Sequence, residues 1–324
     1  MIDFTKKYNR LFTIGCSFTH YAFPTYASVL AEELKVPLYN LGASGASNQY
    51  IASQLFLLDE YYNLTSDDLV ITQWTSPQRH SMLGEDYWDV SDIWSHKGFH
   101  MFDGVSSAKT TEQLRVRIAA VKATSTFKGM LLQSLMLIKS AILYGKSLPC
   151  TVVNLQMQDE VLRKEEPILD PAEHRILNAF KDIQDDIMPS FVSVLYPGYD
   201  NCGEVYDNFE DMHGKAGPET LAIWSKFRKR ELLSDALKYQ VRKTLPEIIS
   251  TPVYEVHPLP TEHLRYIEKI FNYTFSDAVK EMAAADERLY FATGPLGNTR
   301  LEYILEKNQI RHTSLPDNNL TQAK

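Results

Sequence analysis

The strongest constraint on the fold of this chain is an alternation of short apolar strands and amphipathic helices before residue 75. A buried strand is predicted at Arg10–Ile14, and apolar residues recur at helical spacing over Tyr26–Leu34. The order repeats with a strand at Val36–Leu41, a helix at Asn48–Tyr62 and a strand at Leu69–Trp74. Strands that alternate with helices pair in parallel through right-handed crossovers. The pattern predicts a three-layer α/β/α fold around a central parallel sheet.

The alternation resumes later in the chain, after an interruption. A helix at Phe127–Tyr144, a strand at Thr151–Met157 and a helix at Thr261–Phe271 extend the same fold. We therefore assign residues 1–80, 126–158 and 251–275 to one α/β core. The remaining residues are predicted to form an aromatic-rich insertion at 81–125, a mainly helical insertion at 159–250 and a C-terminal extension at 276–324. Within the helical insertion we expect helices at Pro171–Ile187, Pro218–Leu233 and Ser234–Ile249, and a surface loop at Tyr196–Gly217.

Composition narrows the classes of protein to which the chain can belong. The formal net charge is −8 and no dense Lys/Arg stripe occurs, so a nucleic-acid partner is not expected. No stretch approaches the roughly 20 apolar residues of a membrane span, and no signal peptide is recognised. The three cysteines form no disulfide framework, which favours a cytoplasmic location. No cluster has the spacing of metal ligands, and no cofactor is expected. The oligomeric state stays open.

The first candidate for chemistry is Gly15-Cys16-Ser17, directly after the first strand. Ligands of open parallel sheets bind outside the carboxyl ends of the strands, so Ser17 is placed where catalysis is expected. A glycine before the turn lets the backbone bend and expose the hydroxyl group. The alternative is an ordinary turn in which the serine caps a helix.

The second candidate is the polar, glycine-containing turn from Asn40 to Asn48, after the second strand. Strands one and two are predicted neighbours, so this turn is expected beside Ser17. Gly45 is suited to offer a backbone N–H to an oxyanion, and Asn40 is suited to brace the turn. In the alternative interpretation it is an ordinary strand-to-helix turn, in which Ser47 or Asn48 caps the next helix.

The third candidate is His257, which is followed by Pro258 in a loop before a helix. Proline stiffens such a loop, so the imidazole is held in place and can accept a proton from Ser17 if the two meet. A lone His-Pro is otherwise common in loops. Nearby His263 is expected to pack against or cap the following helix.

Taken together, these three segments resemble the SGNH (GDSL-like) hydrolase superfamily. The resemblance covers about half of the chain and implies a flavodoxin-like fold with Ser17 as nucleophile, His257 as base and Gly45 as an oxyanion donor. It implies no metal and no organic cofactor.

The chain departs from the family pattern at three positions. Cys16 stands where the family has aspartate, and as the middle residue of the turn it is expected to point into the core. The family's oxyanion asparagine falls near Pro77, which cannot donate, so Ser76, Gln78 or Gln73 are the candidates for that role. Tyr254 stands in place of the acid of the triad, and the nearest carboxylate, Glu255, is our choice to orient His257.

The sequence therefore predicts a serine esterase or deacylase that works through an acyl-enzyme. The resemblance suggests a small acyl ester or an O-acetylated carbohydrate as substrate. Acyl transfer to a sugar in place of water would use the same residues and remains an alternative. A second alternative is a non-catalytic binding or structural component of a larger assembly. The departures favour it, whereas Ser17, Gly45 and His257 favour the enzyme.

Overall fold

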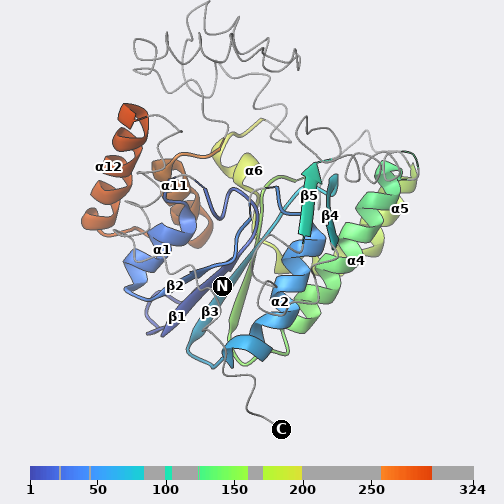
Figure 1. Ribbon diagram of the computed structural model, residues 1–324, viewed down its shortest axis with the longest axis horizontal. Coiled ribbons are helices and arrows are strands. Elements are labelled where there is room, and N and C mark those ends of the chain that lie inside the picture. Colours follow the sequence, from blue (N-terminus) through green and yellow to red (C-terminus); the bar gives the residue numbers. More distant parts are fainter. Residues whose placement is uncertain are drawn as a thin grey trace, which may run out of the picture.

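A four-stranded parallel sheet forms the centre of the molecule in a computed structural model (Figure 1). The structure describes residues 1–21, 23–43, 45–83, 99–103, 123, 125–159, 171–198 and 257–293. The strand order is β2-β1-β3-β6, and the strands are β1 (Arg10–Ile14), β2 (Leu38–Asn40), β3 (Asp68–Trp74) and β6 (Thr151–Gln156). Every pair is parallel, which confirms the predicted fold.

The order of the strands fixes where a ligand site is expected. The chain moves from β1 outward to β2, and then crosses back to place β3 on the other side of β1. Such a reversal leaves the loops after β1 and β3 pointing apart, and ligands bind in the crevice between them. The Ser17 turn follows β1, and residues 75–78 follow β3, so both candidate segments lie at this edge of the sheet.

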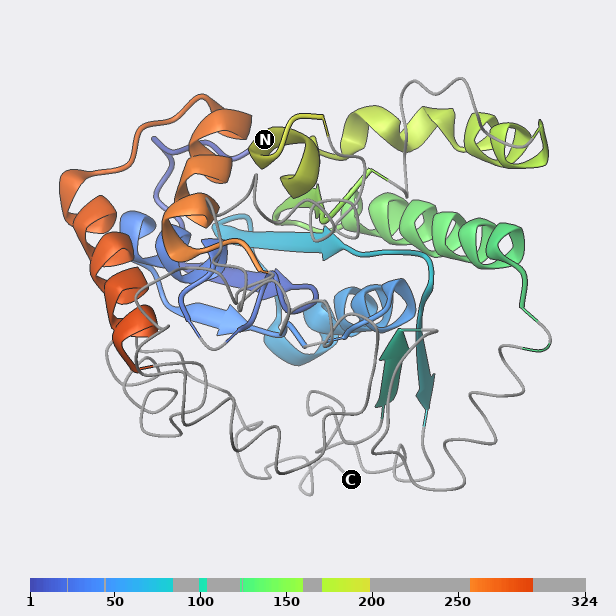
Figure 2. The same ribbon diagram turned by 90° about the horizontal axis from the view of Figure 1, so that it is seen from above.

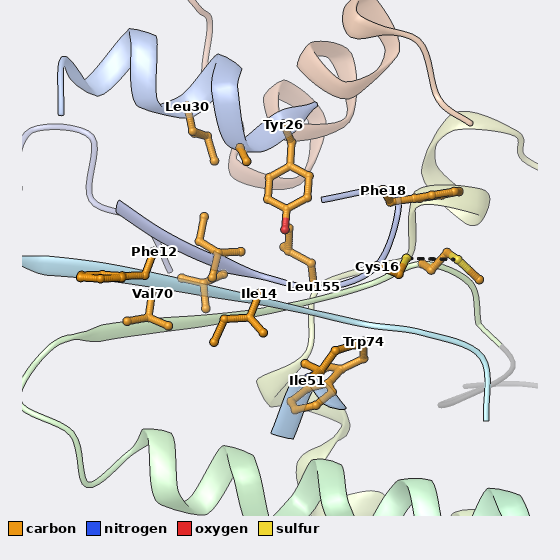
Figure 3. Packing of buried hydrophobic residues seen from close by; sticks show 14 of the residues in the cluster. Phe12, Ile14, Cys16, Phe18, Tyr26, Leu30, Ile51, Val70, Trp74 and Leu155 are labelled. Atoms are coloured by element: carbon orange, nitrogen blue, oxygen red, sulfur yellow. Dashed lines mark hydrogen bonds between the residues drawn. The ribbon is translucent and has the colours of Figure 1, made fainter. Parts of the chain in front are cut away.

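One face of the sheet is covered by α1 (Tyr26–Leu34), α11 (Pro260–Phe271), α12 (Asp277–Thr293) and the short helix α6 (Phe191–Leu195) (Figure 1). Tyr26 and Leu30 of α1 are fully buried and lie on the side of the sheet opposite Ile51 and Trp74 (Figure 3). Phe191 of α6 stacks on Tyr266 of α11 with ring centroids 3.6 Å apart. The segment that bears His257 is therefore fixed to the sheet through its following helix.

The other face is covered by α2 (Asn48–Tyr62) and α4 (Phe127–Gly145), with α5 (Pro171–Ala179) and the 3₁₀ helix η4 (Lys181–Asp186) against α4 (Figure 1). Leu135 and Ile138 of α4 are fully buried. Among the described residues, α4 is the one helix long and apolar enough to cross a membrane, although no stretch of that kind was expected from the sequence; the core helices of soluble proteins share this property. Its contacts with α2 and α5 suit the core layer predicted for it.

Two insertions are described in part. In the aromatic-rich segment, β4 (Arg79–Leu83) and β5 (Phe99–Asp103) pair antiparallel as a separate two-stranded sheet, seen at the lower right of Figure 2. Of the helical insertion, α5, η4 and α6 are described. The loop at Tyr196–Gly217 lies almost entirely, and the helices at Pro218–Leu233 and Ser234–Ile249 entirely, outside the described residues.

Several element bounds differ from the sequence prediction for local reasons. β2 begins at Leu38 and not at Val36, because the Val36 amide closes the end of α1 on the carbonyl of Ala31. The helix expected at Pro171–Ile187 breaks near Phe180, and Ile187 instead forms a parallel bridge with Asn154 at the sheet edge.

The C-terminal side also differs. Residues 277–293, which the sequence placed in an extension, form α12 and pack on α1 and α11.

Candidate active site

The turn that carries Ser17 is held tightly against the end of β3. The amides of Thr19 and His20 both donate to the carbonyl of Cys16, which makes one helical turn after β1. A Cβ atom at Gly15 would lie 2.1 Å from Thr19 Oγ1 and 2.9 Å from the Cβ of Gln73. Glycine is needed here because neighbouring atoms approach too closely for any side chain, and not because the backbone takes an unusual conformation.

The side chain of Gln73, on β3, stabilises this turn by hydrogen bonds to Cys16 and Thr19. Its side-chain oxygen accepts from the backbone amide of Cys16 at 3.3 Å, from Cys16 Sγ at 3.1 Å and from Thr19 Oγ1 at 3.2 Å. Its Nε2 donates to the carbonyl of Trp74 at 2.8 Å. The sequence had offered Gln73 as one possible oxyanion donor, but these contacts make it a support of the nucleophile turn. Cys16 is fully buried, as expected for the residue between Gly15 and Ser17.

Ser17 and His257 meet at the edge of the sheet. Ser17 Oγ lies 2.9 Å from Nε2 of His257, although 240 residues separate them in the sequence. Ser17 is 3% exposed, and His257 is half-buried. The spatial condition for a nucleophile–base pair, that alcohol and imidazole lie within hydrogen-bond reach, is therefore met.

The loop after His257 is ordered by local capping. The backbone amide of Leu259 donates to Glu262 Oε2 at 2.9 Å, and Pro260 occupies the first position of α11, where a missing N–H has no cost. This fixes the path of the chain from His257 into α11. Glu255, the predicted orienting acid, and Tyr254 both lie outside the described residues.

The loop after β2 contacts the Ser17 turn, as the strand order requires. Asn40 Nδ2 donates to the carbonyl of Thr19 at 2.9 Å, and Asn40 Oδ1 accepts from the amide of Gly42 at 3.0 Å. The amide of Ala43 donates to the carbonyl of Gly15. Gly45 has φ +79°, in the region that favours glycine. Asn40 thus ties the two loops together, and the oxyanion role of Gly45 stays a prediction.

Asn48 joins the start of α2 to the exit of β3. Its Nδ2 donates to the carbonyl of Thr75 at 2.9 Å, and its Oδ1 accepts from the amide of the same residue at 2.9 Å. The cap of α2 is Ser47, whose hydroxyl accepts from the amide of Tyr50. Of the two capping candidates in the sequence, Ser47 caps the helix and Asn48 fixes the neighbouring loop.

Ser76 and Gln78 follow Thr75, whose backbone is held by Asn48. Ser76 is 9% exposed, and its hydroxyl accepts from the amide of Gln78 at 3.3 Å. Gln78 itself is exposed. Both stay predicted oxyanion donors, at the loop that the strand order places across the crevice from Ser17.

The sequence did not reveal the aromatic surroundings of His257. Tyr21 stacks on its ring with centroids 3.9 Å apart and an interplanar angle of 28°, and Phe18 meets it edge-on at 5.7 Å. Behind Phe18 lies His263, which is fully buried against Phe191. Burial, and to a smaller extent the nearness of His257, lowers the pKa of His263 to about 3. His263 therefore packs as a neutral ring, one of the two roles expected for it.

No metal-ligand group is found in the described ranges, where no three His, Cys, Asp or Glu side chains stand together. Cys16 and Cys150 are both free thiols, and Cys202 lies outside the described residues.

Comparison with known proteins gives structural neighbours only. No protein-family model and no curated protein match the sequence. One matching structure is a protein described as lipolytic, of the G-D-S-L family, from Desulfitobacterium hafniense DCB-2, with 13% identity over 59% of this chain and 81% of that chain and a TM-score of 0.30. Another is a catalytic mutant of the acetylxylan esterase Axe2 from Geobacillus stearothermophilus, with 12% identity over 57% and 77% of the two chains and a TM-score of 0.27.

A third matching structure is LAE5, an α/β hydrolase enzyme from the metagenome of Lake Arreo, Spain. It shows 12% identity over 57% of this chain and 78% of that chain, with a TM-score of 0.27. Similarities this distant do not transfer an activity, so the function has to be argued from the side chains of the site.

Proposed function

We propose that this chain is a serine ester hydrolase of the SGNH type. The observation that supports this most directly is the 2.9 Å contact between Ser17 Oγ and His257 Nε2 at the carboxyl edge of the sheet. The contact joins two segments that the family motifs had indicated separately. The bracing of both by Gln73, Asn40 and α11 supports a site held in one geometry.

In the proposed reaction, Ser17 Oγ attacks the ester carbonyl while its proton passes to Nε2 of His257. The carbonyl oxygen becomes an oxyanion, which the backbone N–H groups of Ser17 and Gly45 stabilise. His257 then gives the proton to the leaving alcohol, and the acyl group stays on Ser17. A water molecule then gives a proton to His257 while its oxygen attacks the acyl carbon, and the bond between that carbon and Ser17 Oγ breaks. The acid is released, and His257 returns the proton to Ser17 Oγ.

The loop after β3 supplies the third oxyanion donor in this proposal. Pro77 occupies the family position and has no N–H, so Ser76 or Gln78 takes the role. Loss of one oxyanion donor costs on the order of 3 kcal/mol of transition-state stabilisation. A replacement donor that is placed less well than the asparagine recovers only part of this stabilisation, so we expect a slower enzyme than relatives with the asparagine. Small acyl esters, including acetyl groups on carbohydrate, are the proposed substrates.

Labelling with a serine-directed fluorophosphonate tests the proposal. The wild-type protein is expected to take up one label at Ser17, and Ser17→Ala and His257→Ala to take up none. Both variants are also expected to lose activity on an aryl acetate by on the order of a thousandfold or more. Ser140→Ala and His174→Ala, which change exposed residues on α4 and α5, are the matched controls.

Three outcomes are informative. Full activity of Ser17→Ala assigns any hydrolysis to another residue and contradicts the proposal. A wild type that is neither labelled nor active, under conditions that label a control esterase, favours the non-catalytic binding component. Labelling with slow hydrolysis, but fast acylation of an added sugar, identifies an acyltransferase that uses the same residues.

A further inference from the structure

The loop that carries Ser17 also carries two aromatic rings that contact His257. Phe18 and Tyr21 lie between the end of β1 and the start of α1. Phe18 presents its edge to the imidazole at 5.7 Å and 67°, whereas Tyr21 lies nearly parallel to it at 3.9 Å and 28°. The nucleophile and the surroundings of its partner histidine are thus parts of one short segment.

Both rings are themselves fixed from behind. Phe18 is buried and meets the ring of Phe191 edge-on at 5.5 Å. Tyr21 meets Phe23 at 4.9 Å and 70°, and Phe23 is 1% exposed. Phe18 and Tyr21 thus each pack against a buried aromatic ring, so the imidazole of His257 lies against side chains that are in contact with the core.

Face stacking suits the chemistry required of His257. It leaves the edge of the imidazole open, so Nε2 can point at Ser17 Oγ at 2.9 Å. The face of a tyrosine ring is electron-rich and attracts a cation placed over it. When His257 takes the serine proton, its positive charge forms directly against the face of Tyr21.

We propose that Tyr21 is a positioning residue that sets the plane of His257 and stabilises its protonated form during catalysis. The kinetic part of this inference rests on the proposed hydrolase function. In the SGNH family the acid of the triad orients the histidine. In this chain the ring of Tyr21, from the loop that carries Ser17, contributes to that orientation. The part of the side chain that matters is the ring and not the phenol hydroxyl.

The substitutions Tyr21→Leu and Tyr21→Phe distinguish a role of the aromatic ring from a role of the phenol hydroxyl. Tyr21→Leu is expected to lower kcat for an aryl acetate by about tenfold to a hundredfold with KM changed less than about threefold, since the stack acts on His257 and not on substrate binding. Tyr21→Phe keeps the ring and is expected to recover most of that loss. A rise in KM alone, or equal damage by both variants, overturns the proposal.

Phe4→Leu is the matched control. Phe4 stacks on Tyr273 at 3.7 Å and 7°, at the end of α11 remote from His257. The substitution Phe4→Leu removes a stacked aromatic pair of the same kind, so we expect it to reduce stability and to leave kcat unchanged. A similar loss of kcat in Phe4→Leu attributes the effect of Tyr21→Leu to general loosening, which overturns the positioning role.

Proton NMR of the resting protein tests the stack without relying on catalysis. A ring stacked on an imidazole shifts the carbon-bound imidazole protons upfield. The His257 signals, assigned by their loss in His257→Gln, are expected upfield in the wild type and in Tyr21→Phe, and at ordinary positions in Tyr21→Leu. Unshifted wild-type signals overturn the inference. If Ser17→Ala stays active while the upfield signals are present, the hydrolase proposal fails and the stack stands.

Discussion

The side-chain oxygen of Gln73, near the end of β3, accepts a hydrogen bond from the backbone amide of Cys16, the residue that precedes Ser17. A side chain on one strand therefore fixes the nucleophile turn of its neighbour. Two further donors, Cys16 Sγ and Thr19 Oγ1, converge on the same oxygen. The position of Ser17 thus depends on a residue that has no place in the proposed reaction itself.

Gln73→Leu is expected to lower both stability and activity. It leaves buried donors of the Ser17 turn without their acceptor, which costs about 2 to 4 kcal/mol of unfolding free energy. Because the turn can then shift, we also expect kcat on an aryl acetate to fall about tenfold or more. Urea unfolding and steady-state kinetics on the same preparations measure the two effects.

Gln156→Leu provides the control for that variant. Gln156 is a buried amide in the last position of β6, and its Nε2 donates at 3.2 Å to the carbonyl of Met188 and not to the Ser17 turn. Its replacement is expected to reduce stability with little change in kcat. Equal loss of kcat in both variants would show that Gln73 acts only through global stability.

Asn48→Ala is expected to loosen the loop after β3. The substitution removes the donor and the acceptor that hold the backbone of Thr75, at a cost of about 2 to 3 kcal/mol of unfolding free energy. Since Ser76 and Gln78 follow directly, kcat is expected to fall more than KM rises. The control is Asn154→Ala, which removes a buried amide on β6 that accepts a hydrogen bond from Thr72. If kcat is unchanged in Asn48→Ala, the loop after β3 is not part of the oxyanion site.

The sequence predicted the sheet and the location of Ser17 because both depend on local patterns. Apolar runs of strand length and helical spacing lie within short windows, and the order of the elements then determines the side of the sheet on which each turn emerges. The pairing of Ser17 with His257 was anticipated from the motifs, and the structure places them in contact.

The sequence could not predict contacts that depend on packing between distant elements. Gln73 is the next-to-last residue of an otherwise largely apolar strand, and nothing local indicates that its amide reaches Cys16. The stack of Tyr21 on His257 joins residues from opposite ends of the chain. The same holds for the 3₁₀ helix before Ile187, which leads into the bridge between Ile187 and Asn154. The spacing of apolar residues in the segment gives no indication of this bridge.

Asp68→Asn is expected to reduce stability without affecting catalysis. Asp68 accepts from Arg10 at 2.6 Å and 2.8 Å and from the amide of Thr65 at 2.7 Å, at the end of the sheet opposite Ser17. Burial alone would raise the pKa of Asp68, but the hydrogen bonds from Arg10 and Thr65 bring it below its ordinary value. We expect a loss of about 3 kcal/mol at neutral pH and unchanged kcat.

The pH dependence of that loss follows from the sign of the shift. A carboxyl whose folded pKa is lowered contributes stability above the ordinary pKa near 4, and loses it as the pH falls through the folded value. The stability difference between wild type and Asp68→Asn is therefore expected to shrink below about pH 4. Asp186→Asn, which removes a more exposed pair with Lys146, is the control and is expected to cost a small fraction of this. A difference that stays constant down to pH 2 would contradict the assignment.

His263→Phe is expected to make the protein more resistant to acid. The His263 ring is fully buried among Phe18, Tyr26 and Phe191, and its two nitrogens have no hydrogen-bond partner among the described residues. Its pKa of about 3 lies below the ordinary value of 6.5. Between these two values the unfolded chain holds a proton on His263 that the folded chain does not, so protonation favours unfolding as the pH falls.

This linkage lowers stability by about 1 kcal/mol for each pH unit between pH 6.5 and the folded pKa. Phenylalanine fits the same aromatic surroundings and cannot take up a proton. Urea unfolding at pH 7, 5.5 and 4.5 is therefore expected to show a shallower decline for His263→Phe than for wild type, with His174→Gln on the exposed face of α5 following the wild-type curve. If the curves of His263→Phe and wild type run parallel, the ring is charged in the folded protein, and the neutral packing against Phe18 is wrong.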